Sequence, residues 1–224
     1  RLMIQDISKA YFFAPATRDI YIELPPEEAE PGMVGKLEKS LYGTRDAALS
    51  WAEAYTRVLL SMGFEKGRSS PCSFVHKTWD VCTVVHGDDF LSEGPIENLL
   101  KMKAGLEKEF SVKTEILGPD KGQQMEVKVL NRVITWTDEG ILWEPDPRHA
   151  ELIIKDMGLD KAKGVITPGT KEERRAKENH GTLLEDEKAS KYRAIVACMN
   201  YVAMDRLDVA FSVKEVAREM SKPT

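Results

Sequence analysis

Residues 81–91 constrain the fold more than any other part of this 224-residue chain. An apolar run rich in β-branched residues ends at Val85, Gly87-Asp88 follow, and apolar residues resume directly after Asp89. Glycine at the first central position of a two-residue loop supplies the positive φ that a type II′ turn requires. The pattern therefore predicts a tight β-hairpin with two adjacent carboxylates, Asp88 and Asp89, at its tip.

Two carboxylates on a rigid turn suit Mg²⁺, which takes hard oxygen ligands and commonly binds one or two carboxylates together with substrate phosphates. Successive side chains on extended backbone point to opposite faces, so only one of Asp88 and Asp89 can project fully into a given site. An ordinary Gly-Asp hairpin with a solvated second aspartate explains the same residues, because turns collect Asp for local hydrogen bonding. The hairpin alone leaves both interpretations open.

A third carboxylate lies on a short strand predicted at the start of the chain. Alternation places Leu2, Ile4 and Asp6 on one face, so an acid shares the face of apolar residues near the end of the strand. Asp6 either caps the segment after the strand or serves as a third metal-binding carboxylate that meets the hairpin at Asp88. The first interpretation is structural and the second is functional.

The composition is that of an ordinary globular chain, with 42% hydrophobic and 31% charged residues and a net charge of −5. No apolar run approaches the ~20 residues needed to span a bilayer, and no signal-peptide pattern opens the chain. We therefore expect an intracellular protein that is not secreted and has no membrane partner. Three cysteines without framework spacing predict reduced thiols.

Cys72, His76, Cys82 and His86 are residue types that suit a zinc site. If residues 72–76 are extended, they span ~13 Å at ~3.3 Å each, far beyond a shared ion with bonds of ~2 Å. Zinc is therefore not expected. No P-loop, dinucleotide fingerprint or nucleophile triad is indicated either.

Hydrophobic periodicity predicts mixed helices and strands, in the manner of an α+β fold. The remaining predicted strands are 20–24, 34–37, 73–76, 112–117, 125–130 and 132–136. The predicted helices are 45–62, 95–110, 146–158, 192–202 and 209–220, the second with a stripe of Ile96, Leu99, Leu100, Leu106 and Phe110, and the third with Asp146 as N-cap. Trp51 and Tyr55 lie on the apolar stripe of the first helix, so we expect them in the core.

Several motifs occur in an order that points to one family. Asp6-Ile-Ser-Lys-Ala-Tyr11 resembles a first catalytic motif, and Lys39-Ser-Leu-Tyr-Gly43 with Trp51 resembles a template and nucleotide-binding motif. His86-Gly-Asp-Asp89 resembles the motif with two aspartates, although an aromatic residue usually stands where His86 does. Residues 159–168, 192–203 and 208–211 resemble the segments that follow a polymerase core. Together these motifs resemble the reverse transcriptase of copia-type (pseudoviral) LTR retrotransposons.

The resemblance implies a fragment of a Pol polyprotein with an α+β, right-hand polymerase fold. Residues 1–145 would form the palm and partial fingers, and residues 146–160 a thumb-like helix. Residues 161–190 would be a charged linker, and residues 191–224 a helical connection segment leading toward an absent RNase H domain. The fingers would be largely missing.

The implied function is RNA-directed DNA polymerisation inside the cell, in a cytoplasmic particle or the nucleus. The partners would be an RNA template, a DNA primer, deoxynucleoside triphosphates and the rest of the Pol polyprotein, including RNase H. The cofactor would be Mg²⁺, with Mn²⁺ as an alternative. The implied catalytic and metal-binding residues are Asp6, Asp88 and Asp89, the first two as principal ligands. The implied nucleotide-binding residues are Tyr11, Tyr42, Gly43 and Arg45, and Tyr11 would exclude a ribose 2′-hydroxyl.

Two alternatives stay open. RNA-directed RNA polymerases also use Gly-Asp-Asp, but there the residue five positions after the first Asp is typically another acid, whereas here it is Tyr11. The second alternative is a catalytically inactive relic that serves as a binding or structural segment of a larger polypeptide. Intact carboxylates argue against complete decay, and missing fingers argue for it, because fingers residues hold the triphosphate in line.

Overall fold

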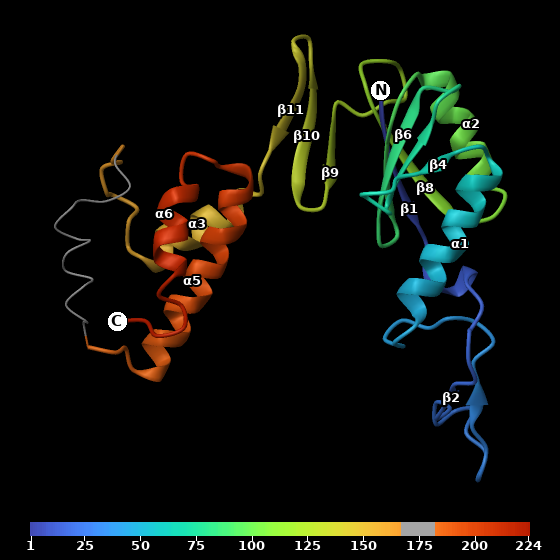
Figure 1. Cartoon of the computed structure of the whole chain (residues 1–224), viewed down its shortest axis with the longest axis horizontal. Helices are drawn as coiled ribbons and strands as arrows, with labels where there is room; N and C mark the ends of the chain where they lie inside the picture. The colour runs from blue at the N-terminus through green and yellow to red at the C-terminus, as the bar shows by residue number, and fades with distance from the viewer. Residues whose placement is uncertain (167–181) are drawn as a thin grey trace. The chain divides into compact units, whose positions relative to one another are not determined.

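The computed structural model describes residues 1–166 and 182–224 and divides into two compact units (Figure 1). The first unit comprises Arg1–Val127 and Thr135–Ile141, and the second comprises Lys128–Ile134 and Leu142–Thr224. Helices and antiparallel sheets are mixed along the chain, which confirms the predicted α+β character. Among the helices described, none has the length and apolar character needed to cross a membrane.

A six-stranded sheet organises the first unit, in the order β4-β5-β6-β7-β1-β8. All of its neighbouring strands run antiparallel. Its strands are β1 (Leu2–Ile7), β4 (Glu65–Lys66), β5 (Ser73–His76), β6 (Val81–His86), β7 (Asp89–Glu93) and β8 (Val112–Leu117). The predictions of strands at 73–76 and 112–117 are confirmed.

The central hairpin forms as predicted between β6 and β7. His86 pairs with Asp89, so Gly87 and Asp88 are the two loop residues. Gly87 has φ +65°, the left-handed value that a type II′ turn needs at its first central position. A Cβ added at Gly87 would meet no atom within 4 Å, so the backbone angle, and not crowding, is what requires glycine here.

Two helices, α1 (Ala47–Ser61) and α2 (Ile96–Leu106), lie along the same side of this sheet (Figure 1). They bury one continuous core against it, and Trp51 and Tyr55 belong to that core as predicted. The stripe of α2 differs from the prediction at one position. Leu100 is 46% exposed, whereas Leu99 is fully buried together with Met102 and Leu106. Spacings of three and four residues place these last three side chains on one face of the helix, and Leu100 lies outside it.

Strand β1 turns alternate side chains toward and away from these helices. Met3 and Ile7 join the helix-facing core. Leu2, Ile4 and Asp6 point to the other side of the sheet, called the second face below, and the side chain of Asp6 is 44% exposed. The prediction that Asp6 shares a face with Leu2 and Ile4 is therefore confirmed, and this face is the one without the helices.

Shorter elements complete the first unit. A 3₁₀ helix, η1 (Ala10–Phe13), follows β1 and was not predicted. The two short strands predicted at 20–24 and 34–37 are present as β2 (Tyr21–Ile22) and β3 (Gly35–Lys36), which pair antiparallel.

A second sheet has the order β11-β10-β9. Its strands are β9 (Glu126–Val129), β10 (Arg132–Thr137) and β11 (Gly140–Glu144). The first two were predicted, and β11 was not. Its sequence, Gly-Ile-Leu-Trp-Glu, holds three adjacent apolar residues and so lacks the alternation that marks a half-buried strand, and all five residues are exposed.

The second unit contains three described helices, α3 (Pro147–Asp156), α5 (Asp186–Asp205) and α6 (Ala210–Ala217). Asp146 caps α3 as predicted, because its side chain accepts a hydrogen bond from the Arg148 backbone N–H at 3.0 Å. The linker predicted at 161–190 should end before residue 186, because α5 begins at Asp186. Acidic residues in that first turn complement the helix dipole. Residues 167–181 of the predicted linker lie outside the described residues.

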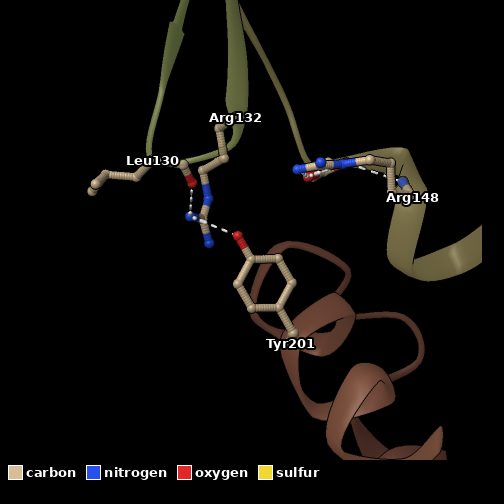
Figure 2. A network of polar contacts seen from close by, with 5 residues as sticks. Leu130, Arg132, Arg148 and Tyr201 are labelled. Atoms are coloured by element: carbon tan, nitrogen blue, oxygen red, sulfur yellow. Dashed lines mark hydrogen bonds and ion pairs between the residues drawn. The ribbon is translucent and has the colours of Figure 1, made fainter.

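One buried ion pair joins β10 to α5 within the second unit. Arg132 Nε donates to Asp205 Oδ1 at 3.1 Å, and the two side chains are only 16% and 12% exposed. The same guanidinium donates to the Leu130 carbonyl at 3.3 Å and lies 3.5 Å from the Tyr201 hydroxyl (Figure 2). Asp205 raises the pKa of Arg132, so the pair stays charged.

The adjacent leucines of α2 give a direct test of this packing. We expect Leu99→Ala to lower the free energy of unfolding by about 2–5 kcal/mol, because it leaves a cavity in the core. Leu100→Ala, the matched control, should change it by about 0.5 kcal/mol or less. Urea unfolding followed by circular dichroism measures both, and equal losses in the two variants would contradict the assigned helix face.

Candidate active site

Four charged or ionisable side chains form a single row on the second face, at the end of the sheet next to the hairpin turn. In the strand register, Asp6 lies opposite Asp89 on one side and opposite Lys113 on the other. Asp89 in turn lies opposite His86. Directly opposite residues have Cβ atoms about 4.5–5.5 Å apart. The row therefore runs His86, Asp89, Asp6, Lys113, with two carboxylates at its centre.

The pKa of Asp89 is shifted by its surroundings, including the two neighbouring carboxylates. Burial raises the pKa of Asp89, the carboxylates of Asp88 and Asp6 raise it further, and His86 lowers it. Like charges disfavour ionisation only when they lie near one another. All three aspartates are therefore within electrostatic reach. Lys113 Nζ lies 3.8 Å from Asp6 Oδ2, but both side chains are well exposed, so this ion pair is weak.

Asp88 occupies the turn beside this row. Its backbone carbonyl accepts a hydrogen bond from the amide of Ile7, the residue after Asp6, at 3.0 Å. The preceding carbonyl, that of Gly87, accepts one from the Trp51 indole N–H at 2.7 Å. In a two-residue turn the flanking residues form the last pair, so the register joins Asp6 to Asp89 and leaves Asp88 at the tip. Which two carboxylates are the principal ligands stays a prediction.

Two of the residues expected to bind nucleotide lie together. Tyr11 of η1 and Tyr42 have ring centroids 4.3 Å apart. Tyr42 and Gly43 are the central residues of a turn closed by a 3.1 Å hydrogen bond from the Thr44 N–H to the Leu41 carbonyl. Gly43 has φ +87°, as a type II turn requires at that position.

The other expected nucleotide-binding residue, Arg45, is exposed between this turn and α1. Ser40, which belongs to the quoted Lys39–Gly43 motif, and Phe12, which sequence reasoning missed, shape this region. Buried Ser40 donates its hydroxyl to the Pro15 carbonyl at 3.0 Å, which holds the turn against the segment after η1. Phe12 places its ring edge-on to Tyr42, with centroids 5.9 Å apart. Nothing local in the sequence marks either contact, because the partners are far apart in the chain.

The carboxylate oxygens of the row are chemically suited to bind a hard cation. Among the described residues, however, no group of three or more His, Cys, Asp or Glu side chains is already arranged to hold a metal ion. Carboxylate oxygens are the ligands that Mg²⁺ prefers, and their mutual repulsion at Asp89 is what a cation would relieve. In donor chemistry, the carboxylates of Asp6, Asp88 and Asp89 suit a divalent cation.

His76, one of the four residues whose types suit zinc, has another role. Its ring stacks on Trp79 with centroids 4.1 Å apart. Its Nε2 lies 3.1 Å from the Met62 carbonyl oxygen, and its Nδ1 accepts from the Trp79 N–H at 3.1 Å. Both ring nitrogens are therefore engaged in structural hydrogen bonds.

Comparison with known proteins gives a consistent set of relatives. Residues 2–171 match the family described as reverse transcriptase (RNA-dependent DNA polymerase). The retrovirus-related Pol polyprotein from transposon TNT 1-94 of Nicotiana tabacum is 26% identical over 229 residues, covering 97% of this chain and 17% of that polyprotein. The corresponding polyprotein from transposon RE1 of Arabidopsis thaliana is 30% identical over 230 residues, covering 98% and 14%.

A transposon polyprotein from yeast matches over a shorter stretch. The truncated transposon Ty1-A Gag-Pol polyprotein of Saccharomyces cerevisiae is 30% identical over 114 residues, covering 50% of this chain and 9% of that polyprotein. The chain thus spans no more than 17% of the length of any of these three relatives.

The raised pKa of Asp89 predicts an unusual pH dependence of stability. The native state binds this proton more tightly than the unfolded state, so stability should fall as pH rises from about 4 through the native pKa. Asp89→Asn should remove this loss and be more stable than the wild-type chain at pH 7. Urea unfolding between pH 4 and pH 7 measures the difference.

The control for this experiment is Asp80→Asn, in the exposed turn at the other end of β6. It should keep the wild-type pH dependence. Parallel stability curves for the wild-type and Asp89→Asn chains would show that the three carboxylates do not interact.

Proposed function

Because the chain belongs to the reverse transcriptase (RNA-dependent DNA polymerase) family, we propose that it extends a DNA primer along an RNA template. The relatives that match nearly all of the chain are Pol polyproteins of transposons, which supports a reverse transcriptase domain within such a polyprotein. The observation that carries the proposal is the row in which Asp6 faces Asp89 beside the turn of Asp88. This row is what nucleotidyl transfer needs from the protein, a fixed group of carboxylates on a rigid sheet.

We propose the same three residues as the metal-binding and catalytic carboxylates. Mg²⁺, or Mn²⁺ in its place, would be held by Asp6, Asp88 and Asp89. When bound, divalent cations would activate the primer 3′-hydroxyl and neutralise charge on the leaving pyrophosphate. The chain's own contribution is to hold the three carboxylates in place before substrate arrives, through the β1–β7 register and the turn hydrogen bonds.

The region around Tyr42 and Gly43 would receive the incoming deoxynucleoside triphosphate. Arg45 is an exposed cation beside this turn and would contact phosphate oxygens, for which a guanidinium is well suited. The ring of Tyr11, packed against Tyr42, would occupy the space that a ribose 2′-hydroxyl needs. These roles extend the family assignment to named residues.

The larger assignments follow from the same proposal. The six-stranded sheet with α1 and α2 would be the palm, and α3 would be the thumb-like helix. The remaining partners would be the RNA template, the DNA primer and the other parts of the Pol polyprotein, including RNase H. The family description, RNA-dependent DNA polymerase, favours this function over an RNA-directed RNA polymerase. The preserved carboxylate row gives no support to an inactive relic.

Primer extension on an oligo(dT)-primed RNA template, with Mg²⁺ or Mn²⁺, tests the proposal. The wild-type chain should add deoxynucleotides, and Asp88→Asn should lower the rate by about 10²–10³-fold, the usual cost of losing one group that stabilises transition-state charge. Asp80→Asn, an aspartate in another turn of the same sheet, should keep the wild-type rate. No extension by the wild-type chain, or equal rates for the wild-type and Asp88→Asn chains, would refute the function or the site respectively.

Selection against ribonucleotides tests the role of Tyr11 separately. Tyr11→Ala removes the ring and should raise the use of ribonucleotides relative to deoxyribonucleotides. Tyr11→Phe keeps the ring and should retain the wild-type preference, because the proposed exclusion is steric. Competition between the two nucleotides during primer extension measures the ratio, and an unchanged ratio in Tyr11→Ala would make Tyr11 an ordinary packing residue.

A further inference from the structure

Both peptide groups that flank the Cα atom of Asp88 are anchored to other elements. The peptide before Asp88 carries the Gly87 carbonyl, which accepts the Trp51 indole N–H at 2.7 Å. The peptide after it carries the Asp88 carbonyl, which accepts the Ile7 N–H at 3.0 Å. Helix α1 and strand β1 therefore hold the turn from two sides.

Because peptide groups are planar, these two hydrogen bonds influence the direction in which the Asp88 side chain points. Between two rigid peptide planes, only φ and ψ of the residue that joins them can vary. Holding the carbonyl oxygen of each plane restrains these two angles, and with them the direction of the Asp88 Cα–Cβ bond. Gly87 adds no restraint of its own, since glycine is conformationally permissive and has no side chain to pack.

The indole is itself held rigidly. Trp51 is only 1% exposed, and its ring packs edge-on against Tyr55 and Phe110, with centroids 5.4 Å and 5.0 Å away. Phe110 follows α2, so the ring is clamped between parts of the core that α1 and α2 build together. A buried ring with two such neighbours cannot swing away, so its N–H points at the Gly87 carbonyl as a fixed donor.

We infer that Trp51 is a positioning residue, whose indole N–H orients the Asp88 carboxylate and thereby sets the affinity of the site for a divalent cation. The inference rests on the proposed function, because it concerns the same carboxylates. It gives the tryptophan of the Lys39–Trp51 motif a task that its burial alone does not suggest. Helix α1, which carries Trp51, begins a few residues after the turn of Tyr42 and Gly43 that is proposed to bind the nucleotide.

A core role and a positioning role make different predictions. If Trp51 only fills space, removing its N–H while keeping its shape should leave Asp88 unchanged. If it orients Asp88, the same change should loosen the turn and weaken cation binding, even when the fold is intact. The test therefore needs a substitution that removes the donor without opening a cavity.

The benzothiophene analogue of tryptophan, placed at position 51 alone, meets this need because sulfur replaces the N–H in an otherwise similar bicyclic ring. Tyr55→Phe is the matched control, since it removes a hydroxyl from the neighbouring buried ring, one helical turn further along α1. Two readouts are measured on the whole chain. They are the ¹⁵N order parameter of the Asp88 amide without metal, and the affinity for Mn²⁺ from the electron paramagnetic resonance signal of the free ion.

In the analogue, we expect the Asp88 order parameter to fall from the rigid value of about 0.85 toward the flexible range below about 0.6. The Mn²⁺ dissociation constant should rise roughly three- to tenfold, as expected for the loss of one buried hydrogen bond. Tyr55→Phe should change neither quantity. Wild-type values of both in the analogue would overturn the inference.

Failure of the proposed function would give a different result from failure of this inference. A wild-type chain that binds no Mn²⁺ would overturn the metal site and the effect of Trp51 on it. The order parameter would then still decide whether the indole fixes Asp88, because that measurement needs neither metal nor substrate. An analogue with a loosened turn but wild-type Mn²⁺ affinity would refute the link between orientation and binding while leaving the metal site in place.

Discussion

The register between β1 and β7 is the constraint on which the candidate site depends. It places Asp6 opposite Asp89, and it also sends Met3 and Ile7 into the core beneath the helices. Side chains alternate along a strand, so a slip of one residue would move the carboxylate into the core and the apolar residues to the second face. The cost of burying a charge among apolar side chains therefore protects the geometry of the site. The position of the proposed site and the packing of the core both result from this one pairing.

The hydrophobic core also offsets the repulsion between the neighbouring carboxylates of the row. Two like charges about 4 Å apart repel by about 1 kcal/mol in water and about 4 kcal/mol near a protein surface. Each fully buried Leu, Phe or Met side chain contributes about 1.5–3 kcal/mol in the other direction. Leu99, Met102 and Phe90, all fully buried, contribute in this opposite direction. The same core fixes α1, and α1 brings Trp51 to the turn.

Local chemistry was predictable from the sequence, and pairing across the sheet was not. The hairpin at Gly87 and Asp88 follows from turn rules that need only neighbouring residues. Helix positions followed from periodicity, although Leu100 was placed on the wrong face because spacings of three and four residues allowed either choice. Lys113 joins the row only through the β1–β8 register, which no local signal encodes. Strand β11 was missed because its exposed residues do not alternate.

We propose that three aspartates, from two strands and one turn, bind the same cation. The most direct measurement follows their ¹³C carboxyl resonances by nuclear magnetic resonance while Mg²⁺ is added to the wild-type chain. The signals of Asp6, Asp88 and Asp89 should shift together, with one shared midpoint, while the signal of Asp80 should not change. Separate midpoints, or a response from only one of the three, would contradict this proposal.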